Sequence, residues 1–356
     1  IEVLNRNIEN LEFLITTITL SSGDLAKDEL KNLPNVHHRF LPVDVHFLID
    51  KFLHKWKPMV IFLVDSEIWP NLIISAKKSN IRLALINARL TRKSFKRWKL
   101  VPKTFQFIFN SINLFLCSNL ETKNYLDKFK INNVVYTGNL KLINQSRKTL
   151  NTSQRLIFLK NKFWMAVSTH RGEEEICLNV HLQLKKKFKN LVTILAPRHI
   201  TRAKEIEKLC MRYNLVSQIL DKNEKMHHNI EIIILNSYGD LIRFYENAQS
   251  VFVGKSLIEK KKNDSGQSPI EAAKFGCKIY HGPYVSNFKE IYDFLEQKDI
   301  AKKIKSENDL LENLIADFEK NEKDISKFSK IMNDLSTDTL NKNMQEINKF
   351  IPNAIK

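Results

Sequence analysis

The chain has 356 residues and a formal net charge of +18. This length suits two domains, and a content of only 8 Gly and 9 Pro argues against long low-complexity segments. The four cysteines form no CxxC pair, so they predict reduced core residues of a cytosolic protein and exclude a disulfide framework. No apolar run is long enough to cross a bilayer.

The positive charge limits the classes of binding partner that can be expected. A field of this size attracts polyanions such as nucleic acid, anionic lipid or phosphorylated substrates. A solvated, lysine-rich surface explains the same charge equally well. Nucleic acid is not expected as a partner, because the sequence shows no zinc-finger spacing, no RNP-like aromatic motif and no single basic domain.

Apolar runs alternate with helical patterns along the first half of the chain, which predicts an α/β fold with parallel sheets flanked by helices. The predicted strands are Leu11–Ile18, Met59–Val64, Ile81–Ile86, Leu114–Cys117 and Val134–Tyr136. Between two of them, apolar residues recur at spacings of three and four, which predicts a helix buried against a sheet. These residues are Leu48, Ile49, Phe52, Leu53 and Trp56.

The second half repeats this plan, so two Rossmann-like domains are predicted. Its predicted strands are Phe163–Val167, Leu191–Leu195, Ile230–Leu235, Ser250–Val253 and Lys278–Tyr280. The boundary is placed in the polar stretch Asn144–Gln154, which gives domains at residues 1–150 and 151–335, followed by a C-terminal helix at 336–356. The helices after Ser306 are charged and amphipathic.

Ligands of parallel sheets bind at the carboxyl ends of strands, so the loops after the first-half strands are candidate sites. The hydroxyls of Thr16–Gly23 suit an oxyanion or a sugar, or an ordinary helix cap. The acids of Asp65–Asn71 suit sugar hydroxyls or proton transfer, or a helix start beside Pro70. No third acid or histidine has ligand spacing there, so no metal is predicted. The basic, aromatic segment Asn87–Trp98 suits phosphates or a membrane surface, or a solvated helix face.

The loops of the second half carry residues suited to phosphate and ribose. Ser168–Glu174 and Ala196–His199 bring an Arg and a His to strand ends, and the planar guanidinium of an Arg suits a phosphate. Ser265–Ala273 is a small-residue loop leading into a helix, with Glu271 placed to accept from both ribose hydroxyls. A further loop, His281–Phe288, follows the last predicted strand.

Together these strings resemble the bacterial Kdo transferases, where Kdo is 3-deoxy-D-manno-octulosonic acid. The matching segments follow the family's order and span nearly the whole chain. They are Thr16–Gly23, Asp65–Asn71, Asn87–Ser94, Thr137–Lys141, Ser168–Glu174, Ala196–His199, Gly239–Leu241, Phe252–Leu257, Gly266–Glu271 and Gly282–Phe288.

The resemblance implies a GT-B fold, in which two Rossmann-like domains face a central cleft. It implies an inverting, metal-independent transfer of Kdo from CMP-Kdo to lipid IVA, with no cofactor, at the cytoplasmic side of the bacterial inner membrane. The first domain would bind the acceptor and the second would bind CMP.

The resemblance also assigns residues. The implied CMP contacts are Pro197, Arg198, Tyr238, Gly239, Asp240, Ser268, Pro269, Ile270 and Glu271. Arg198 would hold the phosphate and Glu271 the ribose. Further contributors to the donor site are Ser168, Thr169, His170, His199 and Ser256. Glu67 would support catalysis near the sugar or acceptor, and Arg89 and Ser94 would lie on the acceptor side.

The sequence departs from the family pattern in three ways. The family's catalytic Glu and its usual membrane-anchoring helix are expected upstream of Ile1, and the role of base is not transferred to Glu2. Ser265 and Ser268 stand where Gly and Asn are usual, and the Lys-rich residues Glu259–Asp264 are additional.

Two other functions are compatible with the pattern. One is a different GT-B transferase that uses a UDP-sugar. The other is a non-catalytic protein that kept the fold and binds anionic lipid or nucleic acid.

Overall fold

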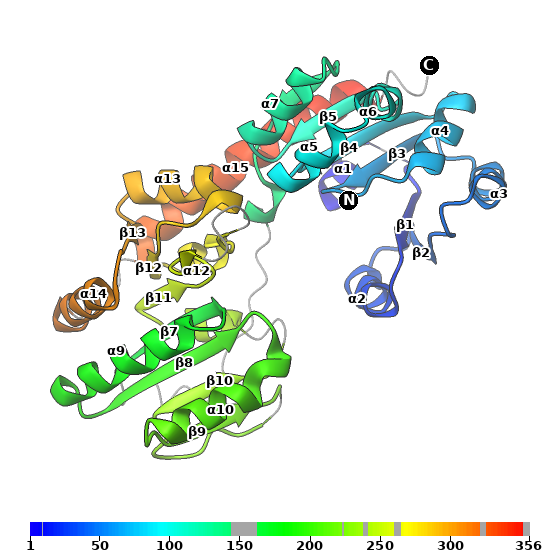
Figure 1. Cartoon of the computed structure of the whole chain (residues 1–356). Coiled ribbons are helices and arrows are strands. Elements are labelled where there is room, and N and C mark those ends of the chain that lie inside the picture. Colours follow the sequence, from blue (N-terminus) through cyan, green and yellow to red (C-terminus); the bar gives the residue numbers. More distant parts are fainter. Residues whose placement is uncertain are drawn as a thin grey trace. The chain divides into compact units, whose positions relative to one another are not determined.

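The computed structural model describes residues 1–8, 10–143, 162–222, 224–237, 241–259, 265–320 and 325–351 (Figure 1). The chain forms two compact units. The first comprises Ile1–Leu90, Trp98–Tyr136 and Glu346–Lys356, and the second comprises Thr91–Arg97 and Thr137–Gln345. The stretch in which we placed the domain boundary, Asn144–Gln154, lies outside the described residues, so the division at residue 150 stays a prediction.

The first unit contains a four-stranded parallel sheet in the order β3-β4-β5-β6. Its strands are β3 (Val60–Val64), β4 (Arg82–Ala88), β5 (Leu114–Cys117) and β6 (Val134–Tyr136). These confirm the corresponding predicted strands. The helices of this part of the chain are α1 (Glu2–Asn7), α3 (His46–Trp56), α4 (Pro70–Lys78), α5 (Arg92–Trp98), α6 (Pro102–Phe109) and α7 (Leu120–Lys128). Helix α3 is the helix predicted from apolar spacing.

The first predicted strand does not join that sheet. Strand β1 (Phe13–Thr17) pairs in parallel with β2 (Val36–Phe40) in a separate two-stranded sheet. Strand β2 was not predicted, because its apolar pattern is broken by His37, His38 and Arg39. Helix α2 (Leu20–Leu30) follows β1 and is capped by Thr19, whose hydroxyl accepts a hydrogen bond from the Ser22 amide (3.2 Å).

The second unit is built on a seven-stranded parallel sheet in the order β13-β12-β11-β7-β8-β10-β9. The strands are β7 (Lys162–Thr169), β8 (Leu191–Pro197), β9 (Ser217–Leu220), β10 (Ile232–Leu235), β11 (Ser250–Val253), β12 (Lys278–His281) and β13 (Ala301–Lys303). The five predicted strands are confirmed. The two that were not predicted, β9 and β13, are the edge strands, which are short and partly polar and so give a weak apolar signal.

Both faces of this sheet are covered, as expected for parallel strands. Along β7, Phe163, Met165 and Val167 face one core, whereas Trp164 and Ala166 face the other. One core is completed by α9 (Glu173–Lys187), α10 (Ala203–Arg212) and α14 (Glu307–Lys320). The other is completed by α11 (Ile242–Tyr245), α12 (Ile270–Lys274), α13 (Lys289–Gln297) and α15 (Ile325–Phe350). Short 3-10 turns lie at η1 (Leu140–Leu142), η2 (Ile200–Arg202) and η4 (Ser286–Phe288).

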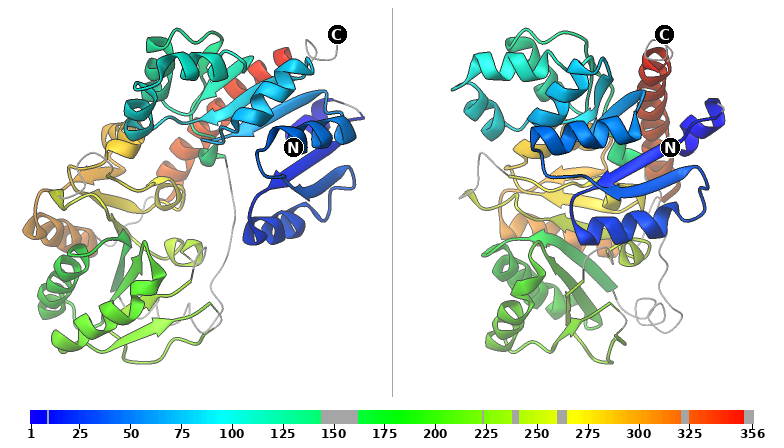
Figure 2. Two further views of the ribbon diagram at one scale, coloured as in Figure 1. Left: turned by 45° about the vertical axis from the view of Figure 1, so that its right-hand side comes forward. Right: turned by 90° about the vertical axis from the view of Figure 1, so that its right-hand side faces the viewer.

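Helix α15 contributes to both units, and Figure 2 shows it as one long helix at the red end of the colour range. Its first half adds Met332 to the core of the second unit, and its end adds Phe350 to the core of the first. Close to Glu346, where α15 passes from the second unit to the first, the Thr137 hydroxyl donates to the Asn343 side-chain oxygen (3.0 Å). The side-chain amide of Asn343 donates to the Thr137 carbonyl (3.3 Å). No helix among the described residues is long and apolar enough to cross a membrane.

A histidine lies inside the second unit. His181 of α9 is fully buried, and its Nδ1 lies 2.8 Å from the hydroxyl of Thr193 on β8. Burial, aided by the charge of Lys185, lowers the pKa of His181 from 6.5 to about 4. The imidazole is therefore neutral in the folded protein at neutral pH.

This histidine predicts a loss of stability in acid. Between pH 6.5 and about 4 the unfolded chain binds a proton at His181 that the folded chain does not, so the free energy of unfolding falls as the pH falls. The full effect is about 3 kcal/mol. Amide hydrogen exchange in α9 at several pH values measures it. In His181→Gln the free energy of unfolding should fall less between pH 6.5 and about 4. In the control His228→Gln, which changes an exposed histidine, it should fall as in the unaltered protein. An equal acid loss in both variants would contradict the assignment.

Candidate functional site

The loops of the second unit converge where the strand order reverses. The chain begins this sheet at β7, adds β8 on one side and later crosses to β11 on the other. Such a reversal in a parallel sheet opens a crevice at the carboxyl ends of the strands. The loops after β12, β11, β7 and β8 leave four neighbouring strands at this edge (Figure 1).

The loop after β7 turns sharply into α9. Ser168 has a φ of 54° and Gly172 a φ of 96°, both in the left-handed region. Gly172 is the N-cap of α9, so the helix begins at Glu173. The turn directs the side chain of Glu173 back toward the strand ends, where only 1% of its surface remains exposed.

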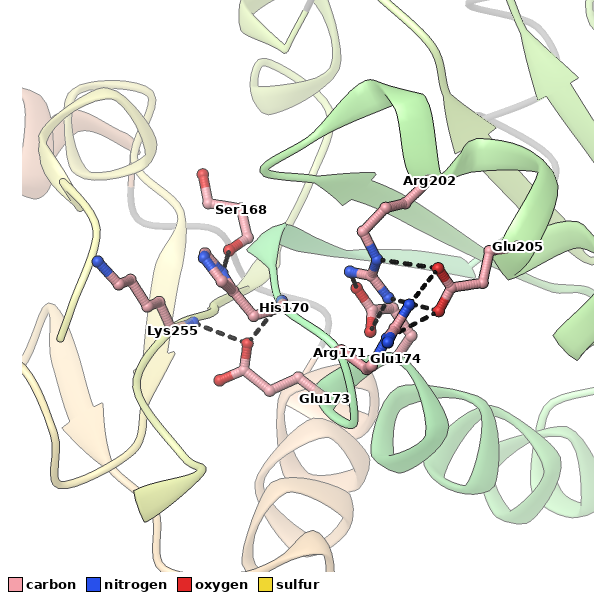
Figure 3. Close-up of polar contacts among 8 residues, drawn as sticks. All are labelled: Ser168, His170, Arg171, Glu173, Glu174, Arg202, Glu205 and Lys255. Atoms are coloured by element: carbon pink, nitrogen blue, oxygen red, sulfur yellow. Dashed lines mark hydrogen bonds and ion pairs between the residues drawn. The ribbon is translucent and has the colours of Figure 1, made fainter. Parts of the chain in front are cut away.

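The Glu173 carboxylate accepts four hydrogen bonds from backbone amides. Two go to Oε2, from His170 (3.0 Å) and Lys255 (2.7 Å), and two go to Oε1, from Ser256 (2.9 Å) and Leu257 (3.1 Å). Figure 3 shows the carboxylate between the loops after β7 and β11. A buried carboxylate is tolerated only when it is well hydrogen-bonded, and these amides supply that stabilisation.

Further hydrogen bonds extend this connection to the two outer loops. The buried Ser256 hydroxyl donates to the Val253 carbonyl (2.6 Å) and accepts from the Gly282 amide (2.9 Å), which joins the loops after β11 and β12. The Arg198 amide donates to the Thr169 carbonyl (3.1 Å), which joins the loops after β8 and β7. Ser256 and Thr169, both predicted donor-site residues, are fully buried, and the Ser256 hydroxyl and the Thr169 carbonyl take part in these connections between loops. Their contact with the donor stays a prediction.

The arginines at this edge differ in their partners. Arg171 forms a two-bond pair with Glu205 (3.1 and 2.9 Å), and Arg202 forms another with Glu174 (2.7 and 3.2 Å), as Figure 3 shows. Hydrogen bonds from Arg171 and Arg202 lower the pKa of Glu205. Arg198 is exposed, and its guanidinium has no hydrogen bond or ion pair to any residue in the described part of the chain.

Two predicted histidines lie together beside Arg198. The rings of His170 and His199 meet edge to face with centroids 5.8 Å apart. His170 Nδ1 lies 3.1 Å from the Ser168 carbonyl, so Ser168 and His170 form one tight turn. The structure thus brings Ser168, His170, His199 and Arg198 to the same edge of the sheet.

The segment that leads into α12 is tied to the loop after β11. The Gly266 amide donates to the Lys255 carbonyl (2.7 Å), and the buried Ser265 hydroxyl lies 3.2 Å from that of Ser286. The serine that replaces the family's usual glycine at 265 therefore has its own structural partner. The phenol of Tyr292 donates to the Gln267 carbonyl (2.9 Å).

The predicted ribose site follows this segment. Pro269 and Ile270 are buried, whereas Ser268 and Glu271 are exposed. Desolvation by the surrounding protein raises the pKa of Glu271, although its side chain keeps contact with solvent, and Lys274 partly offsets this. Pro197 is buried at the end of β8. Tyr238, Gly239, Asp240 and the inserted residues 260–264 lie outside the described residues.

Hydrogen bonds also connect the predicted acceptor loops of the first unit, which follow β3 and β4. Asp65 and Asn87, at the ends of β3 and β4, both have left-handed backbones. The side-chain amide of Asn87 donates to the Asp65 carboxylate. The Ser66 hydroxyl donates to the carbonyl of the half-buried Arg89 (2.7 Å). Glu67 is exposed, and its carboxylate accepts from the indole of Trp69 (2.8 Å).

The helices after these loops start as ordinary capped helices. Helix α4 begins at Pro70, and the Asp44 carboxylate accepts from the amides of Asn71 (3.0 Å) and Leu72 (2.9 Å), a cap that the sequence pattern did not predict. Helix α5 begins after Thr91, whose hydroxyl accepts from the Ser94 amide (3.2 Å).

The carboxylate that joins the loops was missed as a functional residue. The sequence analysis named Glu173 only within the segment Ser168–Glu174. A Gly followed by a Glu after a predicted strand indicates a helix start and could have drawn attention to this residue. Within the described ranges, no three His, Cys, Asp or Glu side chains gather in a way that could hold a metal ion. The expectation of a metal-independent reaction stays a prediction.

Comparison with known proteins identifies relatives that match most of the chain. A family model described as 3-deoxy-D-manno-octulosonic-acid transferase (kdotransferase) matches residues 1–144. The 3-deoxy-D-manno-octulosonic acid transferase of Rickettsia typhi is 32% identical over 86% of this chain and 65% of its own length. That of Haemophilus influenzae is 29% identical over 88% of this chain and 73% of its own length. The chain thus spans about two thirds of the length of the first of these relatives.

A solved structure shows the same fold. A glycosyltransferase from Rickettsia africae superposes with a TM-score of 0.59, covering 98% of this chain and 100% of that one at 11% identity. At this identity the likeness concerns the fold alone, and it confirms the predicted GT-B architecture of two α/β units with parallel sheets. The cleft predicted between the two units stays a prediction.

The close packing of the loops predicts that a side chain at Gly282 is not tolerated. A Cβ on Gly282 would lie 2.1 Å from the Ser256 carbonyl oxygen, which is backbone and cannot turn away. Gly282→Ala should lower the free energy of unfolding by at least about 2 kcal/mol. Gly23→Ala is the control, because its Cβ would meet only the side chains of Phe40 and His38, which can shift. Urea unfolding compares the two, and equal stability of both variants would refute the prediction.

Proposed function

Because the chain belongs to the family of 3-deoxy-D-manno-octulosonic-acid transferases, we propose that it transfers Kdo from CMP-Kdo to lipid IVA. The reaction proposed is inverting and needs no metal or other cofactor. We place it at the cytoplasmic face of the bacterial inner membrane. The donor, the acceptor and the location follow from the family resemblance of the motifs, and the site of the second unit supports the choice of an anionic donor.

The observation that carries the proposal is the free guanidinium of Arg198. Of the three arginines on the loops after β7 and β8, Arg171 and Arg202 are neutralised by glutamates, whereas Arg198 has no partner among the described residues. An uncompensated, exposed guanidinium at a crevice between strand ends suits a phosphate, which it can bind through two parallel hydrogen bonds. Arg198 is therefore proposed to bind the phosphate of CMP.

This placement has a chemical consequence. The bond between Kdo and the phosphate breaks through an oxocarbenium-like transition state, and negative charge develops on the departing CMP. A guanidinium that the backbone of Arg198 carries to this edge can pair with the phosphate and stabilise this charge as it develops. We assign Arg198 that role, so it contributes to the rate as well as to donor binding.

Glu271 is proposed to accept hydrogen bonds from the two ribose hydroxyls. It lies on α12, whose leading segment is tied to the loop after β11 by the bond between Gly266 and Lys255. Strands β11 and β8 flank β7 in the sheet, so the segments carrying Glu271 and Arg198 leave the same edge. This supports one nucleotide site built from both.

The acceptor side is proposed to lie in the first predicted domain, residues 1–150. Glu67 is exposed at the end of β3 and oriented by Trp69, which suits a supporting contact to a sugar hydroxyl. Arg89 and Ser94 are proposed to meet the phosphorylated acceptor. The base that removes the proton of the attacking hydroxyl is proposed to be the Glu that the family carries upstream of Ile1.

The choice of nucleotide can be tested by ligand stabilisation. CMP should raise the melting temperature of the chain, because a ligand present at 100 times its Kd adds about 2.7 kcal/mol to folding stability. UDP and UDP-sugars at the same concentration should have little effect. Differential scanning fluorimetry measures both, and stronger protection by UDP would replace the proposed donor with a UDP-sugar.

The role of Arg198 predicts a selective loss of affinity. Arg198→Ala should weaken CMP binding at least about tenfold, or about 1.4 kcal/mol, because a charge-assisted contact is lost. Arg171→Ala is a matched control, since its charge on the same edge is already paired with Glu205. Isothermal titration calorimetry gives both affinities. Unchanged affinity in Arg198→Ala, or an equal loss in Arg171→Ala, would remove the assignment.

The reaction itself is tested with the complete product of the gene, incubated with CMP-Kdo and lipid IVA. A Kdo-bearing lipid product, detected by mass spectrometry, is the expected result. A folded protein that binds CMP and anionic lipid but forms no product would instead be a non-catalytic relative.

A further inference from the structure

We infer that Glu173 is a positioning residue for the donor site. It holds the loops after β7 and β11 together, and hydrogen bonds from these two loops support Arg198 and the segment leading to Glu271. The functional part of this inference rests on the proposed function. The loop-holding part rests on the contacts of Glu173 alone.

Glu173 differs from its neighbour Glu174 in what balances its charge. Both side chains are 1% exposed and lie in the first turn of α9. The Glu174 carboxylate forms an ion pair with Arg202 (2.7 Å). Glu173 has no basic side chain within ion-pair distance in the described part of the chain, and four backbone amides take that place. Loss of the Glu173 carboxylate would therefore leave four loop amides without an acceptor.

The amides that Glu173 binds come from chain segments far apart in sequence. The amide of His170 belongs to its own turn, whereas those of Lys255, Ser256 and Leu257 follow β11, 82 to 84 positions further along. A buried amide without an acceptor destabilises the folded state. Without the carboxylate, the loops after β7 and β11 would have to move apart and admit water.

The packing around the carboxylate is close. A Cβ on Gly254 would lie 2.7 Å from both Glu173 Oε2 and the Cα of Thr169. The backbones of the two loops thus approach as near as a glycine permits. Such packing transmits a displacement of one loop directly to the other.

A chain of hydrogen bonds leads from Glu173 to both proposed ligand contacts. In one direction, Glu173 holds the turn at His170, and the adjacent Thr169 carbonyl accepts from the Arg198 amide (3.1 Å). In the other direction, Glu173 holds the Lys255 amide, and the Lys255 carbonyl accepts from Gly266 at the start of the segment that leads to α12 (2.7 Å). A single carboxylate therefore connects the supports of the phosphate contact and of the ribose contact.

Chemical rescue tests this role directly. Glu173→Ala removes a group with the size and charge of an acetate ion and leaves a space bordered by four amides. In this variant, hydrogen exchange at the amides of 168–170 and 254–257 should become faster, and CMP affinity should fall at least about tenfold. Excess sodium acetate should restore both, whereas sodium chloride at equal ionic strength should not.

Glu174→Ala is the matched control. It loses a carboxylate of equal burial from the adjacent position, but that carboxylate pairs with Arg202 and, among the described residues, forms no hydrogen bond to an amide of the loops after β7 and β11. Its loop amides should stay protected, and acetate should have no effect on its exchange or on its affinity for CMP. A general loss of stability would affect both variants alike, so acetate rescue confined to Glu173→Ala separates positioning from bulk stability.

The outcomes decide the two proposals separately. Unchanged loop exchange in Glu173→Ala, or faster exchange that acetate does not reverse, overturns the inference. If the loops open and close again with acetate but the unaltered chain does not bind CMP, the loop-holding role stands and the proposed donor falls. If Glu173→Ala does not fold, Glu173→Gln replaces it, and unchanged exchange at the same amides in that isosteric variant overturns the inference.

Discussion

The carboxylate of Glu173 is the interaction on which the geometry of the second unit's strand ends depends. A parallel sheet delivers its loops to one edge, but parallel pairing does not by itself fix the loops relative to one another. Their amides point into a region that is sealed from water, where each needs an acceptor. A carboxylate has acceptor capacity for four such donors, and Glu173 uses it on two loops at once. The low polarity of the site strengthens these bonds and makes their loss costly.

The first unit meets the same requirement with shorter side chains. At the ends of β3 and β4, the left-handed backbones of Asp65 and Asn87 bring their side chains within hydrogen-bonding distance. Asn and Asp tolerate this backbone conformation better than other residues with a side chain. In both units, then, a polar side chain from one strand end satisfies the neighbouring strand end. The two proposed substrate-binding surfaces are thus held by local networks within their own unit.

In the seven-stranded sheet, the sequence predicted the inner strands and missed the two edge strands, whereas in the two smaller sheets the missed strand was β2. Continuous apolar runs mark strands buried on both faces, as in β7 and β10, whereas β2 and β13 are mostly polar and lack that signal. The candidate loops were predictable because ligands of parallel sheets bind at strand ends. The role of Glu173 was not, because most of its partners are backbone amides more than 80 positions away, and backbone amides carry no sequence signature. Ser256 was predicted to contribute to the donor site. Its hydroxyl bonds to Val253 and Gly282, and its contact with the donor stays a prediction.

The distribution of charge at the site explains why the net charge of +18 was a poor guide to function. Charges on a solvated surface are screened over about 8 Å at physiological ionic strength, so the total mainly influences encounter with anionic partners. What distinguishes one arginine from another is its immediate surroundings. Arg171 and Arg202 share Glu205, and Arg202 also pairs with Glu174, so their charges are balanced within the protein. The guanidinium of Arg198, at the end of β8, has no such balance among the described residues, while the Arg198 amide donates to the Thr169 carbonyl. An exposed charge on a fixed backbone is suited to an incoming phosphate, because the side chain, and not the backbone, must be ordered when the ligand binds.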